Sequence, residues 1–287
     1  MRDSPDTRAG VEQILQEALR LGEEDAWEEM ADHLRAALEE DPGNPYFLCW
    51  LGVAEREMGL DMMAYDHFKE CLAQQPDDPH VLATAGNGVA AFDDPDAEAA
   101  LRTAAVMAPE LSLARWMYGA YLSREGMAEK ALEELEAARD LDPENPTILY
   151  ELGVALLLDD ALDAAVDVLD ESIRLGPDDG WARVVLGLIL LRSGRDEEAL
   201  RDLAEGARHR PEDVEAQLLA ALAAASRGHL DLAHEMLERA RQRAEGVAEA
   251  TVLEAEERID AGEEAAERFL EETLAPSALR ERLMARP

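Results

Sequence analysis

Three short motifs in this sequence have residue types and spacings that could support chemistry. His67 and Cys71 lie four residues apart, so on a helix both side chains would share one face and could bind a metal ion. Segment 86–91 matches the G-x-G-x-x-A pattern of dinucleotide-binding loops. Segment 93–96 carries three aspartates, and carboxylates are the ligands that calcium prefers.

Each motif lacks the surroundings that its chemistry requires. No second pair of ligands accompanies His67, and Cys71 occupies a position that is Ala in most of the repeats described below, so we interpret Cys71 as a small core residue. Segment 86–91 falls inside a predicted helix with no preceding strand. Segment 93–96 lacks the Gly and the terminal Glu of a calcium loop and is typical of a turn followed by a helix start. The sequence therefore predicts no catalytic site, no metal site and no cofactor, and a protein that is not an enzyme.

The elements that position these residues are helices repeated along the chain. A small residue recurs every 33 or 34 residues, and a proline recurs at the same interval. The small residues are Ala18, Gly52, Gly86, Gly119, Gly153, Gly187, Ala221 and Ala255, and the prolines are Pro42, Pro76, Pro109, Pro143, Pro177 and Pro211. Two independent spacings of this length predict stacked helix-turn-helix units, none of which can bury its apolar face alone.

One of these units shows the complete pattern. From Pro45 it reads Leu48-x-x-Leu51-Gly52, then Gly59, Ala64-x-x-x-Phe68-x-x-Cys71 and Pro76. This pattern is similar to the tetratricopeptide repeat. A small residue at the eighth position allows the two helices to cross closely, Gly at the fifteenth supplies a left-handed turn, and the proline ends the second helix.

The resemblance implies the fold class and the domain organisation. We expect an all-α protein, a right-handed superhelical solenoid of antiparallel helix pairs. About eight repeats are expected over residues 11–274, with starts near 11, 45, 79, 112, 146, 180, 214 and 248. Residues 1–10 are expected to form a flexible N-terminus. Residues 275–287 are expected to form a C-terminal capping helix, because Leu279 and Leu283 lie four residues apart.

The charge of the chain restricts its partners. There are 27 basic and 65 acidic residues, and the formal net charge is −38. Phosphates of nucleic acids and anionic lipid head groups would be repelled by this charge, so neither nucleic acid nor a membrane is expected as a partner. No apolar segment is long enough to be a signal or a membrane span, and only two cysteines are present. These features predict a cytoplasmic location, although adaptation to high salt is another explanation of the acidity.

The charge is distributed unevenly between the helices. The resemblance implies that the first helix of each repeat lines a concave surface. Six of these predicted helices contain the acids Glu55, Glu57, Glu151 and Glu215 and the arginines Arg56, Arg115, Arg124, Arg183, Arg192 and Arg227. Six positive charges minus four negative charges leave +2 on these helices. The concave groove is therefore predicted to be apolar, aromatic and weakly basic, with the acids on the convex side.

These observations predict a non-catalytic scaffold or adaptor that binds a peptide or helical segment of a partner protein. Trp, Tyr and Arg often contribute most of the binding energy at interfaces. The residues expected to form the groove are Tyr46, Trp50, Arg56, Asn87, Trp116, Arg124, Tyr150, Trp181, Leu188 and Arg192. Alternatively, the aromatic rings fill gaps between repeats. An alternative function is that the acidic convex face mimics a nucleic acid or docks basic proteins.

Overall fold

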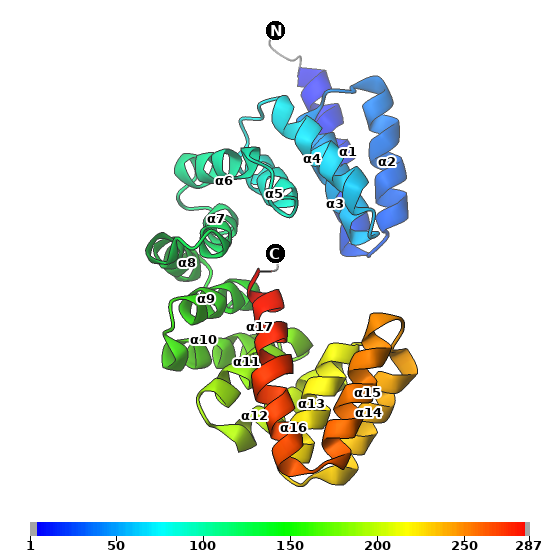
Figure 1. The fold of residues 1–287 in the computed structure, drawn as a ribbon. Helices are drawn as coiled ribbons and strands as arrows, with labels where there is room; N and C mark the ends of the chain where they lie inside the picture. The colour runs from blue at the N-terminus through cyan, green and yellow to red at the C-terminus, as the bar shows by residue number, and fades with distance from the viewer. Residues whose placement is uncertain (1–4, 285–287) are drawn as a thin grey trace. The chain divides into compact units, whose positions relative to one another are not determined.

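The repeating pattern of the sequence becomes a succession of helix pairs (Figure 1). The computed structural model describes the backbone of residues 5–284 and the side chains of residues 10–281, 283 and 284; it contains no strand there. The first helices are α1 (Pro5–Glu23), α3 (Pro45–Glu57), α5 (Pro79–Ala90), α7 (Ser112–Arg124), α9 (Pro146–Leu158), α11 (Gly180–Arg192), α13 (Val214–Ser226) and α15 (Val247–Asp260). The second helices are α2 (Trp27–Glu40), α4 (Asp61–Ala73), α6 (Asp96–Met107), α8 (Ala128–Leu141), α10 (Leu162–Leu175), α12 (Asp196–His209), α14 (Leu230–Arg243) and α16 (Glu263–Phe269). A π-helical turn, η1 (Leu270–Leu274), connects α16 to α17 (Ala275–Met284).

The predicted all-α solenoid of helix pairs is confirmed. The chain divides into two compact modules, an N-terminal module of residues 5–122 and a C-terminal module of residues 123–284. Within each module, successive helices pack against their neighbours, for example α3 against α4 and α11 against α12. None of the helices in residues 5–284 has the length and apolarity needed to span a membrane.

The first helices begin at residues that satisfy the free N–H groups of their first turn. Asn44, Asp78, Asn145, Asp179 and Asp213 cap α3, α5, α9, α11 and α13. The side-chain oxygen of each accepts a hydrogen bond from one or two backbone N–H groups at 2.8 to 3.5 Å. In α3, α5 and α9 a proline follows the cap, where its missing N–H costs nothing. These caps set where each first helix begins, and hence which side chains face outward.

The small residue at the eighth position of a repeat lies where the two helices of the pair cross. A Cβ atom added to Gly52 would lie 2.8 Å from the ring of Phe68, and one added to Gly153 would lie 2.6 Å from Leu169. Contacts this short do not occur between real Cβ atoms and carbon. The crossing therefore requires glycine in these repeats, as the sequence predicted.

The turn between the helices of each pair has a left-handed residue. The predicted glycines Gly59, Gly126, Gly194, Gly228 and Gly262 all have positive φ. In the three remaining repeats the same position is an aspartate with positive φ, namely Asp25, Asp93 and Asp160. Aspartate tolerates this conformation better than most residues, because its short side chain can hydrogen-bond locally. Segment 93–96 thus belongs partly to a turn, which agrees with its interpretation as turn and helix-start chemistry.

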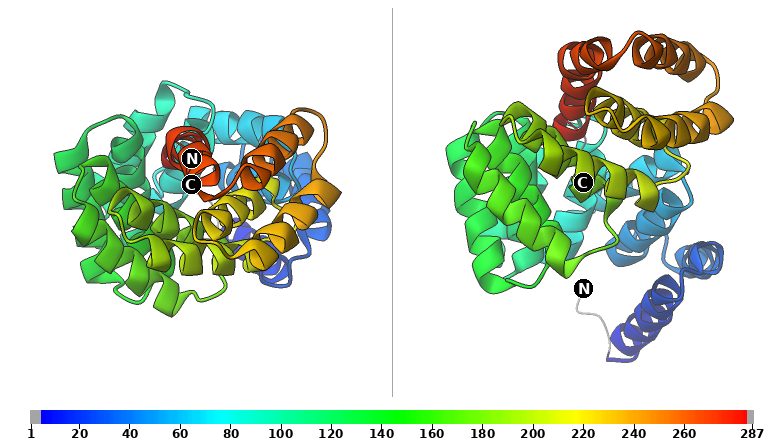
Figure 2. Two further views of the ribbon diagram at one scale, coloured as in Figure 1. Left: turned by 60° about the horizontal axis from the view of Figure 1, so that its bottom comes forward. Right: turned by 90° about the horizontal axis from the view of Figure 1, so that it is seen from below.

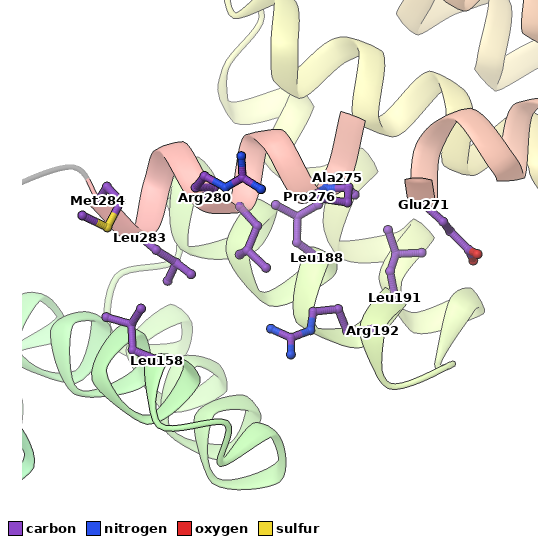
Figure 3. A pocket seen from close by; sticks show the side chains of 11 residues that line it. Leu158, Leu188, Leu191, Arg192, Glu271, Ala275, Pro276, Arg280, Leu283 and Met284 are labelled. Carbon is purple, nitrogen blue, oxygen red and sulfur yellow. The ribbon is translucent and has the colours of Figure 1, made fainter. Parts of the chain in front are cut away.

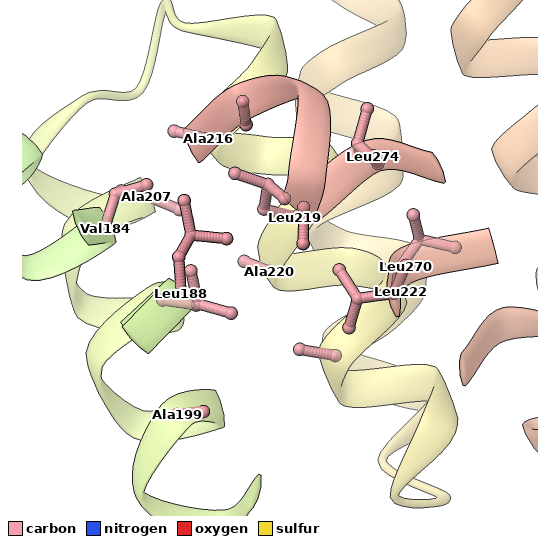
Figure 4. Close-up of a cluster of buried hydrophobic side chains, with 14 of the residues drawn as sticks. Val184, Leu188, Ala199, Ala207, Ala216, Leu219, Ala220, Leu222, Leu270 and Leu274 are labelled. Carbon is pink, nitrogen blue, oxygen red and sulfur yellow. The ribbon is translucent and has the colours of Figure 1, made fainter. Parts of the chain in front are cut away.

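The end of the chain departs from the repeat pattern. Helix α16 packs against α13 as well as α15, and α17 packs against η1 and α11 (Figure 2). Leu270 and Leu274 of η1 are buried in the core of the C-terminal module together with Leu219 and Leu222 of α13 (Figure 4). The segment that was expected to cap the last repeat therefore contacts the first helices of earlier repeats.

Both predicted terminal segments extend beyond the described residues. Helix α1 begins at Pro5, inside the stretch that the sequence predicts as flexible, and residues 1–4 of that stretch lie outside the described part of the chain. Residues 275–284 of the predicted capping helix form α17, and residues 285–287 lie outside the described part.

A substitution at the helix crossing tests this account of the fold. We expect Gly52→Ala to lower the free energy of unfolding of the N-terminal module by about 1–3 kcal/mol, because the new methyl group overpacks the contact with Phe68. Gly10→Ala in α1 is the control: nothing lies within 4 Å of its added Cβ, and alanine favours a helix by about 0.5–1 kcal/mol over glycine. Urea unfolding followed by circular dichroism measures both; equal stability of the two variants would contradict the crossing constraint.

Candidate peptide-binding surfaces

Three predicted aromatic residues lie in the N-terminal module, and all are half-buried. Tyr46 on α3 donates its hydroxyl to the carboxylate of Asp78, the cap of α5, at 3.3 Å. Trp50 packs against the core formed by α1 to α3, and Trp116 against the core formed by α5 to α7. Each ring fills space between helices and keeps part of its surface accessible. The two interpretations of these rings, packing and binding, are therefore compatible.

The two polar residues predicted in this module differ in their accessibility. Arg56 lies near the end of α3, and its side chain is 37% exposed with Nε 3.8 Å from Glu57. Asn87 on α5 is only 3% exposed. Of these two side chains, Arg56 is the one that a partner could reach without rearrangement of the module.

An acid that the sequence assigned to the inner surface is enclosed in the N-terminal module. Glu55 on α3 is fully buried, accepts a hydrogen bond from Arg35 at 3.0 Å, and lies 2.6 Å from Nδ1 of His67. Cys71 is buried, as the core interpretation predicted, and its thiol donates to the carbonyl of Pro45 at 3.2 Å. His67 and Cys71 therefore serve separate structural contacts. Within residues 5–284 no group of three His, Cys, Asp or Glu side chains is placed to hold a metal ion.

In the C-terminal module, Arg124 and Glu151 form a buried ion pair. The guanidinium of Arg124, at the end of α7, contacts both carboxylate oxygens of Glu151 on α9; the Nη2 to Oε1 distance is 3.3 Å. Both side chains are at most 3% exposed. Arg124 was predicted to line the groove, and the structure places it in this pair instead of at an accessible surface. The pair neutralises another of the acids on the first helices.

The predicted aromatic residues of this module lie near the starts of their helices. Tyr150 on α9 and Trp181 on α11 are half-buried and pack against the core. The guanidinium of Arg210 lies over the Trp181 ring, with its Cζ 4.9 Å from the ring centroid. This cation–π contact fixes the ring and leaves part of it accessible.

Leu188 and Arg192 come together at a cavity on the C-terminal half of α11 (Figure 3). The cavity has a volume of about 640 Å³ and lies between α9 and α11 on one side and η1 and α17 on the other. Leu158, Leu188 and Leu191 form the first wall, and Leu279 and Leu283 of α17 belong to the second. Arg192 is 44% exposed and its Nη2 lies 3.0 Å from Asp160. The cavity is thus an apolar site with an arginine at its rim.

The predicted residues of the C-terminal module do not form a single cluster. Trp181 and Arg192 are separated by eleven residues on α11, which corresponds to about 16 Å along a helix. The aromatic residues therefore lie toward the starts of the first helices and the accessible arginine toward an end. An arginine in the last turn also interacts favourably with the helix dipole.

Sequence reasoning left some cavity residues out of the predicted site. Leu158 and Leu191 occupy inward-facing positions of the repeat pattern, so that pattern could have found both. Leu279 and Leu283 were assigned to a capping helix, and no local signal indicated that this helix would contact α11.

One carboxylate near the cavity is in surroundings that disfavour its charge. Desolvation by burial raises the pKa of Glu271 on η1, and the negative charges of Glu267 and Asp196 raise it further. The positive charge of Arg227 lowers the pKa of Glu271 and so opposes this rise. The Arg227 guanidinium lies 3.1 Å from Asp196 and also contacts Glu267. The charged form of Glu271 therefore does not favour folding.

The second helices carry exposed acids. A shallow hollow of about 660 Å³ on α8 is lined mainly by acidic side chains, together with Leu132 and Ala137. The acids are Glu129, Glu133, Glu136, Asp140 and Asp159. This hollow is therefore an acidic concavity on the C-terminal module.

The class of protein follows from the fold and from a family match. Residues 119–180 and 184–248 match the family model of the tetratricopeptide repeat. The helix pairs outside these residues show the same crossing and turn, for example at Gly52 and Gly59. The described residues form about eight helix pairs, and those in the matched segments are similar to tetratricopeptide repeats. No curated protein sequence matches it.

Several solved structures share this fold. The structure of pilF from Pseudomonas aeruginosa is 19% identical with a TM-score of 0.59, and the match covers 79% of this chain and 99% of that chain. A chain of the APC/C hetero-tetramer Cut9–Hcn1 is 17% identical with a TM-score of 0.68, covering 83% of this chain and 47% of that chain. A thermophilic tetratricopeptide-repeat protein of Thermus thermophilus is 21% identical with a TM-score of 0.51, covering 63% of this chain and 98% of that chain. At these identities the similarity establishes the fold.

The buried ion pair makes a prediction about stability. Either Arg124→Met or Glu151→Leu should lower the free energy of unfolding of the C-terminal module by about 3–5 kcal/mol, because each removes one member of a buried ion pair. The double variant should be much less destabilised than the sum of the two. Urea unfolding of the four proteins gives the coupling; additive effects would show that the pair does not behave as a unit.

The raised pKa of Glu271 predicts a stability effect that depends on pH. A carboxyl group whose pKa is higher in the folded state opposes folding when it is charged, and this penalty disappears as the pH falls below its unfolded pKa. Glu271→Gln should therefore raise the free energy of unfolding at pH 7, and the gain should shrink toward zero near pH 4, about the ordinary pKa of glutamate. Glu257→Gln, at an exposed position of α15, is the control. A gain that is independent of pH would contradict this explanation.

Proposed function

We propose that this protein is a non-catalytic protein–protein interaction scaffold that binds a peptide or helical segment of a partner protein on the faces of its first helices. The observation that carries the proposal is the chemical character of these faces. They present partly exposed aromatic rings and arginines, whereas two of their acids, Glu55 and Glu151, are buried in ion pairs. The fold supports the interaction role but does not identify a partner.

The accessible members of the predicted set are the ones expected to touch the partner. They are Tyr46, Trp50, Arg56, Trp116, Tyr150, Trp181 and Arg192. The enclosed residues Asn87, Arg124 and Leu188 would support the surface from beneath. Half-buried rings suit this role, because their orientation is already fixed and little side-chain entropy is lost on binding. The two cysteines are free and buried, which agrees with the proposed cytoplasmic location.

Photo-crosslinking followed by affinity measurement tests the proposal. A crosslinking amino acid at Arg192 or Tyr150 should attach to one defined segment of a partner, and the same amino acid at Glu133 on α8 should not. A synthetic peptide of the attached segment should then bind about tenfold or more weakly to Trp181→Ala and Tyr150→Ala than to the wild-type chain. Glu133→Ala is the matched control, and circular dichroism checks the fold. Unchanged affinity of both aromatic variants would refute binding on this face.

A second candidate function uses the acidic surface. The hollow on α8 supports it, because five carboxylates around one concavity create a strong negative potential. In this case the protein would mimic a nucleic acid or dock basic proteins. Salt separates the two functions: the screening length falls from about 8 Å at physiological ionic strength to about 3 Å at 1 M. Binding that is lost on Glu133→Lys and at 1 M salt would favour the acidic surface.

A further inference from the structure

We propose that α17 is an exchangeable occupant of a helix-binding groove in the C-terminal module, and that its competitor is an amphipathic helix of a partner protein. The groove is the face of α9 and α11 that carries Leu158, Leu188 and Leu191. This inference rests on the proposed function; it names the class of ligand for the C-terminal module and the way in which access to it is controlled.

The packing of α17 shows what kind of ligand the groove accepts. Ala275, Ala278 and Leu279 are buried and Leu283 is half-buried, so the apolar side chains occur at positions i, i+3, i+4 and i+8 of one helix face. They pack in the core to which α11 contributes Leu188 and Leu191. Ser277 and Arg280 are exposed. An amphipathic helix laid into an apolar groove through residues at this spacing is a recurring mode of peptide recognition.

The fit of α17 to the groove is incomplete. The cavity of about 640 Å³ remains between α17 and the wall formed by α9 and α11. This space is partly open to solvent, so α17 leaves part of the apolar surface of α9 and α11 uncovered. Leu158 at its edge is 37% exposed and Met284 at the end of α17 is 55% exposed. A helix with larger apolar side chains than Ala275 would bury more of this surface and would bind more tightly.

The connection between α16 and α17 permits α17 to leave without disturbing the rest of the module. Ala266 on α16 and Leu270 on η1 are at most 1% exposed, so both elements are held in the core. The segment η1 has π-helical hydrogen bonding, which is rare and is often found at functional sites. Pro276 follows as the second residue of α17 and has no N–H to continue the helical hydrogen bonds. The chain therefore has a natural point of separation after Leu274.

The experiment uses the full-length chain and the sequence of α17 itself as the probe. Leu279→Glu places a charge on the buried face of α17 and should release the helix; Ser277→Glu adds the same charge on its exposed face. A fluorescein-labelled synthetic peptide of residues 270–284 is titrated with each protein, and its anisotropy is measured. We expect Leu279→Glu to bind the peptide at least about tenfold more tightly than the wild type or Ser277→Glu, because the tethered helix no longer competes at a high effective concentration.

A second substitution shows where the peptide binds. Adding Leu158→Glu to Leu279→Glu should return peptide binding to the wild-type level, since Leu158 lies on the groove wall and is accessible enough to replace without unfolding the module. Hydrogen exchange gives an independent readout: in Leu279→Glu the amides of residues 277–284 should lose protection while those of α16 keep it. Leu283→Glu, at a half-buried position, replaces Leu279→Glu if that variant unfolds cooperatively.

Two results would overturn the inference. The first is equal peptide affinity of Leu279→Glu, Ser277→Glu and the wild type. The second is simultaneous loss of protection in α16 and α17, which would make α17 an integral part of the core. Either result leaves the scaffold function testable on its own, because the aromatic substitutions at Tyr150 and Trp181 lie away from α17 and report on partner binding separately.

Discussion

The close crossing of the two helices in each pair is the constraint on which the rest of the structure depends. At Gly52, Gly153 and Gly187 no Cβ atom fits against the side chain of the facing helix. This contact fixes the rotation of both helices about their axes. Because successive pairs repeat it, the same positions of every first helix face away from the second helices. Within each module, the accessible rings and arginines owe their orientation to this backbone contact.

The burial of two acids explains how a strongly acidic chain presents first helices with little free negative charge. Glu55 and Glu151 are both enclosed, and each has at least one cation as a partner. A buried carboxylate without a partner would cost several kcal/mol, so Arg35 and Arg124 are structural requirements once the acids are buried. The consequence for recognition is indirect. A partner protein cannot reach Arg124. The negative charge of Glu151, which would repel an acidic peptide, is enclosed together with it.

Most of the fold could be predicted from the sequence, because the repeat rests on local rules. Turn glycines, caps and prolines act within a few residues. The spacing of the prolines and of the small residues at the helix crossing was enough to place the helix pairs. Asp25 and Asp160 were missed as turn residues although they lie at the same spacing. The contact of α17 with α11 and the burial of Arg124 could not be predicted, because both depend on packing between segments far apart in the sequence. The sequence therefore predicted which helices carry the candidate site, whereas only the structure showed which of its residues are accessible.

In the groove and at the end of the repeat array, apolar faces of first helices need to be covered by another surface. A stack of helix pairs presents apolar first-helix faces, and exposed apolar faces of this size favour association with another surface. In the C-terminal module, α16 and η1 pack closely on α13 and cover its apolar face. Leu218 and Leu222 on α13 are at most 1% exposed. On α11 the covering is looser, and a cavity remains beneath α17. The change from a filled to an unfilled contact occurs at the π-helical turn. This open cleft is the part of the first-helix faces that α17 leaves accessible, and it is the surface that the proposed exchange of α17 would use.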